Sequence, residues 1–233
     1  GLALLTFLAH GETPTSKEFG TTVRKAMEWL SSDPMDKTLG KSYGHAIKTY
    51  ALSEAYAMTG VSMLEDAMNK GIRIIIDGQQ KSGSFNYNYK QDRQDLSLAG
   101  WNYQALKAAY GGGCEEAGLN DAIYKSVDWL KARAASNSEG KGFPYALTNG
   151  AKNRPGKKAT MRAVGVLCLQ LFGEGNTPEL ADEINKIATD DYAKLSWANP
   201  PKESLYGWYY ATQAMFQKGG NAWDSWNKKF QKE

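Results

Sequence analysis

Cysteine and histidine are scarce in this chain of 233 residues, which limits the chemistry that it can support. The two cysteines, Cys114 and Cys168, and the two histidines, His10 and His45, show no spacing typical of metal ligands. We therefore expect no zinc site, no other metal and no cofactor. Cys168 lies in an apolar helical run, which favours a buried thiol, but the sequence alone also permits a disulfide with Cys114.

Strong net charge and long apolar runs are also missing. The formal charge is only +3 and no basic run stands out, so nucleic acid is not an expected partner. No apolar stretch approaches the roughly 20 residues that a membrane span needs, so we expect no transmembrane segment in this chain. The chain begins without methionine inside a helical pattern, which favours a piece of a longer protein. Any targeting segment would lie upstream, and the sequence predicts no location.

Helical periodicity, by contrast, runs through the whole chain in two forms. The first form is an inner type, apolar or small-sided on most faces, as expected of a helix surrounded by other elements. These segments are Leu2 to Ala9, Gly44 to Met58, Leu96 to Tyr110, Thr160 to Phe172 and Leu205 to Lys218. Each is followed by a glycine that can take the left-handed helix stop: Gly11, Gly60, Gly111, Gly173 and Gly219.

The second form is an outer type with one apolar stripe and one polar face. The segments are Thr21 to Ser31, Met63 to Gly78, Leu119 to Ala134 and Pro178 to Tyr192. In the second of them, Met63, Gly71 and Ile75 fall on one helical face, so we interpret the strand-like run Ile72 to Ile76 as helix. A last short helix, Ala222 to Lys232, spaces Trp223, Trp226 and Phe230 so that they pack on what precedes.

Inner and outer segments alternate along the chain, which is typical of an array of helical hairpins. Strand patterns are nearly absent, so the predicted fold class is all-α. Because the inner helices need neighbours on most sides, we expect the array to curl into an α/α toroid rather than to remain open. The sequence predicts one domain, 1–233, with about five hairpins in an inner and an outer layer.

The loops after outer helices share a feature. Gly78 to Phe85 contains a glutamine, a glycine turn and an aromatic residue, and Glu139 to Tyr145 contains a glycine turn and an aromatic residue. We expect a glutamine amide to satisfy open backbone groups at a helix end, and the aromatic ring to cover the joint between hairpins.

These motifs resemble the squalene/hopene cyclase-like branch of the terpenoid cyclase and protein prenyltransferase superfamily, with its prenyltransferase and squalene oxidase repeats. The repeat copy is clearest in Gly71 to Phe85, where phenylalanine stands in place of the usual tryptophan. Trp29-Leu30 and Trp129-Leu130 end two other outer helices in the same style. Asp95 to Trp101 and Leu205 to Gln213 are similar to inner-helix openings of bacterial cyclase-like proteins of unassigned role. The resemblance implies an α/α toroid; the five hairpins are fewer than the family commonly has, so either a part precedes Gly1 or the ring is incomplete.

The resemblance also implies where an acid would lie. Squalene–hopene cyclases protonate an alkene with an aspartic acid in the motif Asp-x-Asp-Asp-Thr-Ala. Here Asp92 and Asp95 match its first and last aspartates, but Gln94 occupies the position of the proton donor. Glutamine is not an acid, which argues against squalene cyclisation by that route. Asp92 and Asp95 remain the catalytic candidates; the simpler interpretations are a solvated loop residue and a helix cap.

Candidate ligand-binding residues lie near the starts of inner helices. They are His45, Trp101, Tyr103, Tyr206, Trp208 and Tyr209. Aromatic walls of this kind hold polyprenyl chains or stack on sugars, but aromatic residues at helical spacing also simply fill a core. His45 either faces the mouth of the ring or is a satisfied core or capping residue.

Three functions follow from this pattern. The first is a cyclase-like protein that binds an isoprenoid or other apolar small molecule in a central cavity, with uncertain activity. The second is a non-catalytic binding or interaction module on the same scaffold, which Gln94 favours. The third is a carbohydrate-active α/α toroid. A dry apolar cavity containing Asp92 or Asp95 would favour the first, a plugged centre the second, and a wet groove with paired carboxylates the third.

Overall fold

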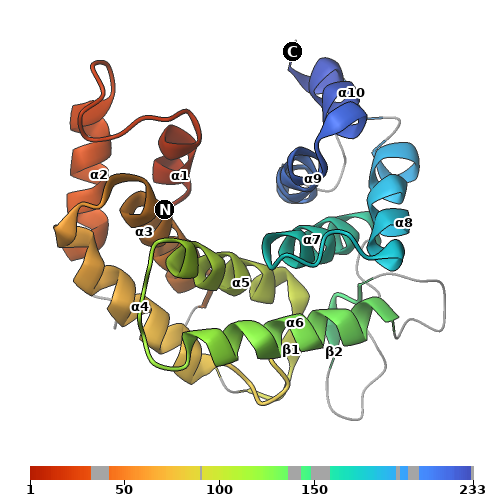
Figure 1. The fold of residues 1–233 in the computed structure, drawn as a ribbon, viewed down its shortest axis with the longest axis horizontal. Coiled ribbons are helices and arrows are strands. Elements are labelled where there is room, and N and C mark those ends of the chain that lie inside the picture. Colours follow the sequence, from red (N-terminus) through yellow and green to blue (C-terminus); the bar gives the residue numbers. More distant parts are fainter. Residues whose placement is uncertain are drawn as a thin grey trace. The chain divides into compact units, whose positions relative to one another are not determined.

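The computed structural model describes residues 1–32, 42–89, 91–135, 143–147, 158–192, 195–198 and 205–231 (Figure 1). Across these ranges the regular structure is helical, apart from two strands of two residues each, β1 (Gln94–Asp95) and β2 (Ala146–Leu147). The predicted all-α class is therefore confirmed. Contacts divide the chain into two compact units, Gly1–Ser126 and Val127–Glu233, and the division falls within α6 (Leu119–Ala135).

In the first unit the helices follow the predicted segments closely. They are α1 (Leu2–Ala9), α2 (Gly20–Ser32), α3 (Ser42–Thr59), α4 (Glu65–Gly78) and α5 (Leu96–Gly111), with a 3₁₀ turn η2 (Ser62–Leu64) before α4. Helix α3 packs against α1 and α5, α2 contacts α1 and α3, and α4 contacts α3 and α5. Both α2 and α4, predicted as outer, thus cover two helices predicted as inner.

The second unit repeats this relation. It contains α7 (Lys158–Leu171), α8 (Pro178–Lys186), a π-helical turn η3 (Ile187–Asp191), α9 (Leu205–Lys218) and α10 (Gly220–Phe230). Helix α9 packs against α7 and α10, while α8 contacts both α7 and α9.

Helix ends show why the chain breaks where it does. Thr177 caps α8 by accepting a hydrogen bond from the Leu180 N–H, and Pro178 opens its first turn. Four of the predicted stop glycines have positive φ: Gly11, Gly60, Gly173 and Gly219. The prediction for Gly111 is wrong. Gly111 is the last residue of α5, Gly112 is its C-cap with φ −81°, and the left-handed position falls at Gly113, with φ +80°.

The apolar stripe of α4 differs from the predicted one at its start. Met63 lies in η2 and is 44% exposed, whereas Met68 and Ile72 are buried. The 3₁₀ turn shifts the register before the α-helix begins, so the stripe starts one residue later, at the buried Leu64. Ile72 to Ile76 lie within α4 and are helical, as predicted.

The loop after α4 has the predicted construction. The Gln79 Nε2 amide donates to Gly83 O at 3.1 Å and to Ala122 O at 2.9 Å, so one side chain satisfies carbonyls of the loop and of α6. Phe85 is fully buried with its ring edge-on to Tyr103, 5.8 Å between centroids. In the second loop, residues 139–142 lie outside the described ranges, but Phe143 is buried.

Two further expectations can be compared with the described residues. None of the helices in this part of the chain combines the length and hydropathy needed to span a bilayer. Cys114 and Cys168 are both thiols, and Cys168 is fully buried, as its apolar surroundings predicted.

Helices α3 and α4 approach each other closely at Gly71, which yields a test of the packing. A methyl group at position 71 would lie 2.6 Å from Thr49 Oγ1 and 2.9 Å from its Cγ2. Since Thr49 is β-branched and stiff, Gly71→Ala should lower the free energy of unfolding by about 1–3 kcal/mol, measured by chemical denaturation. Gly44→Ala is the matched control: nothing lies within 4 Å of its Cβ, so it should raise stability by about 0.5–1 kcal/mol. Equal gains for both variants would contradict the close approach.

Candidate functional site

Asp95 lies at the start of α5, where the chain turns from an extended loop into a buried helix. Its backbone is extended, and its Oδ1 accepts a hydrogen bond from the Leu98 N–H at 3.3 Å and from Ser97 Oγ at 2.6 Å. The helix-cap interpretation of Asp95 is thus supported by its geometry.

The second carboxylate oxygen of Asp95 pairs with an arginine. Asp95 Oδ2 lies 2.7 Å from Arg93 Nη2, and the Asp95 side chain is fully buried. Burial raises the pKa of Asp95, while the Ser97 hydrogen bond and the positive charge of Arg93 act to lower it. The carboxylate is therefore held in place from both oxygens.

Aromatic side chains surround this ion pair. Arg93 lies over the Tyr87 ring at 5.5 Å, and Tyr43 meets Tyr87 edge-on at 5.4 Å. The Tyr43 hydroxyl lies 2.6 Å from Ser97 Oγ. Because Ser97 gives its only hydroxyl proton to Asp95, the Tyr43 O–H must be the donor to Ser97. The cluster ties the start of α3 to the start of α5.

Asp92, the other catalytic candidate, is exposed in the loop before Arg93, whereas Asp95 is buried. The two carboxylates thus lie in different environments and not in a common dry pocket. Across the described residues, no group of three or more histidine, cysteine, aspartate or glutamate side chains is arranged to hold a metal ion.

His45 belongs to a second buried network, on α3. Its Nδ1 lies 2.8 Å from the Tyr89 hydroxyl, which donates to Asn102 Oδ1 at 3.0 Å, and Asn102 Nδ2 donates to Leu98 O at 3.1 Å. Since the Tyr89 proton goes to Asn102, the neutral His45 ring must carry its proton on Nδ1. Its Nε2 faces Thr49 Oγ1 at the long distance of 3.5 Å.

Burial, together with the smaller effect of the positive charge of Lys48, lowers the pKa of His45 to about 4. His45 is thus a neutral core residue that links α3, the Tyr89 loop and α5. Burial likewise raises the pKa of Tyr89. Of the two alternatives for His45, the satisfied core residue fits these contacts.

Trp101 and Tyr103 are both core residues of α5. Tyr103 is almost fully buried and donates its hydroxyl proton to Gly83 O at 3.1 Å, while Trp101 is also buried. Tyr103 thus supports the loop that Gln79 and Phe85 organise.

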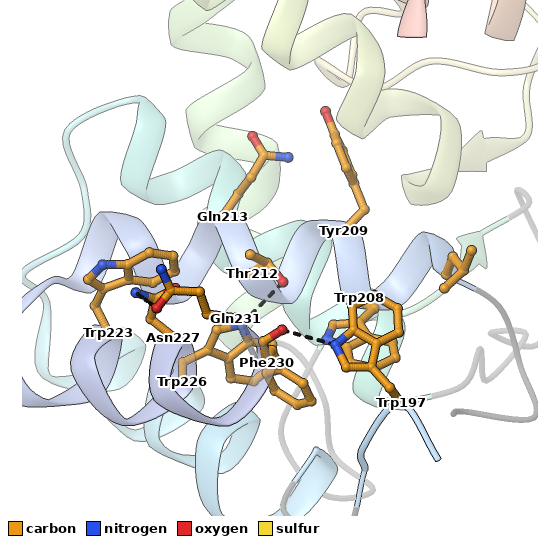
Figure 2. A pocket seen from close by; sticks show the side chains of 11 residues that line it. Trp197, Trp208, Tyr209, Thr212, Gln213, Trp223, Trp226, Asn227, Phe230 and Gln231 are labelled. Carbon is orange, nitrogen blue, oxygen red and sulfur yellow. Dashed lines mark hydrogen bonds between the residues drawn. The ribbon is translucent and has the colours of Figure 1, made fainter. Parts of the chain in front are cut away.

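A pocket with a largely aromatic lining lies in the second unit, along α9 and α10 (Figure 2). We call it the aromatic pocket; its volume is about 400 Å³. It is lined by Trp197, Leu205, Trp208, Tyr209, Thr212, Gln213, Trp223, Trp226, Asn227, Phe230 and Gln231. Trp208 and Tyr209 were predicted as ligand-binding; Tyr206 is not among the lining residues and packs against Tyr210, 4.9 Å between ring centroids.

Four of the six aromatic rings that line the pocket form a continuous series. Trp197 lies 4.6 Å from Trp208, Trp208 lies 4.7 Å from Phe230, and Phe230 lies 4.7 Å from Trp226, all between ring centroids. Trp208 and Trp226 are largely buried, whereas Trp197 is 46% exposed. In Figure 2, Tyr209 and Gln213 point to the same side of α9, as expected four residues apart.

Sequence reasoning missed part of this site. The spacing of Trp223, Trp226 and Phe230 predicted packing on α9, and Trp226 does so by donating its indole N–H to Thr212 Oγ1 at 3.2 Å. Trp197 lies between helices, where no periodicity signals a role. Its indole N–H donates to Phe230 O at 2.9 Å, a contact that only the fold brings about.

The predicted site residues fall on both units: His45, Asp92, Asp95, Trp101 and Tyr103 on the first, and Tyr206, Trp208 and Tyr209 on the second. Comparison of the chain with protein-family models, with curated proteins and with solved structures gives no match.

The cap geometry predicts how Asp95 contributes to stability. Asp95→Ala removes the acceptor of the Leu98 N–H and the partner of Arg93, so the free energy of unfolding should fall by about 1–2 kcal/mol in chemical denaturation. Asp92→Ala is the control and should change it by less than about 0.5 kcal/mol, since Asp92 is exposed. If Asp95→Ala leaves stability unchanged, the capping role is wrong.

The buried network predicts a pH dependence for His45. In the unfolded chain the ordinary pKa of His45 is 6.5, and in the folded protein it is about 4, so between these values the unfolded state binds more protons. Stability from keeping His45 neutral is present above pH 6.5 and is lost as the pH falls towards 4, by about 3 kcal/mol in all. The measurement is the free energy of unfolding at several pH values for the wild type and for His45→Gln. The difference between the two should shrink on acidification; parallel profiles would contradict a neutral buried His45.

Proposed function

We propose that this protein is a binding module that holds an apolar small molecule, such as an isoprenoid, in the aromatic pocket. The observation that carries the proposal is the lining: tryptophan, tyrosine and phenylalanine side chains from α9, α10 and Trp197 line an open pocket of about 400 Å³. Small-molecule sites are commonly concave, of several hundred Å³, and mostly apolar with a few polar groups.

A catalytic role by alkene protonation has less support. Such an acid must be protonated and free to transfer its proton into a dry cavity. Asp95 instead accepts hydrogen bonds on Oδ1 and pairs with Arg93 on Oδ2, and Asp92 is exposed. With Gln94 in the donor position of the cyclase motif, binding without this chemistry is the function that we propose.

We also propose that the helices form a squalene/hopene cyclase-like α/α toroid. In each unit, helices of the inner type pack against each other, as α3 does on α5 and α7 on α9. The outer helices α4 and α8 each cover such a pair. This relation supports repeating hairpins; a closed ring and a single domain over 1–233 stay predictions.

A second candidate function is carbohydrate binding. It is favoured by the amide side chains of the aromatic pocket, two of which, Asn227 and Gln231, lie on the same side of α10 as Trp223. Aromatic faces stack on the apolar faces of sugar rings, and amides can donate to and accept from hydroxyl groups. Binding of an apolar ligand must therefore be compared directly with binding of a sugar.

Trp223 offers a binding test because it lines the pocket and is only half-buried. We expect geraniol to quench the tryptophan fluorescence of the protein saturably, and Trp223→Ala to weaken its affinity about tenfold, through lost aromatic contact worth about 1.4 kcal/mol. Trp29→Ala is the matched control: Trp29 lies on α2 and is 66% exposed, so the affinity should not change. If methyl glucoside binds saturably and geraniol does not bind, the proposed apolar ligand is wrong and carbohydrate binding takes its place.

A further inference from the structure

The polar groups of the aromatic pocket allow the ligand class to be narrowed; this step rests on the proposed function. We infer that the pocket selects a neutral apolar alcohol, an apolar chain or ring that ends in a hydroxyl group, over the corresponding diphosphate. The reasons are the charge of the lining, the state of its indole N–H groups and the position of two amides.

The part of the lining that the structure describes carries no charged side chain. Of the eleven described residues that form the aromatic pocket, all are aromatic, aliphatic, hydroxyl or amide side chains. A diphosphate or carboxylate needs a cation or a cluster of N–H donors to replace its hydration. The described lining offers an anion no such cation, so it favours a neutral ligand.

Two described lysines, Lys228 and Lys229, follow Asn227 in the last turn of α10 and are not among the lining residues. Lys229 Nζ lies 5.1 Å from the centroid of the Phe230 ring, and it donates a hydrogen bond to Tyr192 O at 2.9 Å. This ammonium group is therefore already hydrogen-bonded within the protein. Its partial desolvation lowers the pKa of Lys229.

Two of the indole N–H groups of the wall are already used within the protein. Trp197 Nε1 donates to Phe230 O and Trp226 Nε1 donates to Thr212 Oγ1. These rings therefore offer a ligand their faces and edges but not their donors. They suit the carbon skeleton of the ligand rather than its polar end.

Asn227 and Gln231 provide the polar end of the site. They lie four residues apart, so they share one side of the α10 C-terminus with Trp223, and Figure 2 shows Asn227 beside Trp223. The contact between the two amides is long, 3.5 Å from Asn227 Nδ2 to Gln231 Oε1. This contact does not involve Asn227 Oδ1, which can accept a hydrogen bond, or Gln231 Nε2, which can donate one. A hydroxyl group can both donate and accept, so it can pair with the two amides at once.

The proposal is tested with three probes of one carbon skeleton: geraniol, geranyl diphosphate and the hydrocarbon myrcene. We expect geraniol to bind at least tenfold more tightly than geranyl diphosphate and several-fold more tightly than myrcene, in fluorescence titrations of the full chain. Affinity of the diphosphate equal to or above that of the alcohol overturns the inference.

Variants of the amides separate the hydroxyl contact from general packing. The double variant Asn227→Leu with Gln231→Leu should lose several-fold affinity for geraniol and keep its affinity for myrcene. Gln217→Leu is the matched control, because Gln217 is exposed on α9 outside the lining, and should alter neither. Equal loss for both probes overturns the hydroxyl contact while the proposed function stands.

A failure of the proposed function has a different signature. If none of the three probes binds saturably, or if Trp223→Ala changes none of their affinities, the apolar ligand is wrong and the inference falls with it. Binding of methyl glucoside with the same dependence on Asn227 and Gln231 would assign the amides to a sugar.

Discussion

The burial of α5 on nearly all sides is the constraint on which the first unit depends. Small or apolar residues lie on nearly all sides of this helix, so it has no broad polar face that could be exposed to water. It must find protein neighbours in several directions, and α3 and α4 supply two of them. The same requirement acts on α9, which α7, α8 and α10 contact in the second unit. The alternation of two helix types is the direct consequence.

Because α5 is buried on nearly all sides, the polar groups near it need hydrogen-bond partners within the protein. Asp95, Ser97 and Tyr43 form one chain of hydrogen bonds, and His45, Tyr89, Asn102 and the Leu98 carbonyl form another. Each hydrogen bond removes part of the desolvation penalty that burial imposes. Asp95 and His45, which the sequence offered as catalytic and ligand-binding candidates, thus form hydrogen bonds that hold α3, the connecting loop and α5 together.

The aromatic pocket arises from a different balance. Helix α10 contributes Trp223, Trp226 and Phe230 from neighbouring positions, and the buried members of the set pack against α9. The remaining ring faces line a concave surface because there are more aromatic side chains here than the contact between two helices can bury. A pocket built in this way offers mostly apolar contact and a few amide groups.

The sequence by itself determined the helices, their two types and most of their ends. Local rules control these features: the 3.6-residue period and glycine in the left-handed conformation. For Asp95 the sequence left a helix cap and a catalytic role both open, and the structure supports the cap. The sequence also indicated that Gln79 and Phe85 would organise a joint, because the motif is contiguous. It did not distinguish Trp101 and Tyr103, which fill the core, from Trp208 and Tyr209, which line a pocket, since both pairs open inner-type helices.

Only the tertiary structure decided which aromatic residues meet. Trp197 reaches Phe230 across 33 residues of sequence, and Arg93 neutralises Asp95 while Asp92, three positions earlier, stays exposed. Exposure and pairing of this kind depend on which segments lie side by side. Periodicity along one helix carries no information about that, because it records which face is buried but not what buries it.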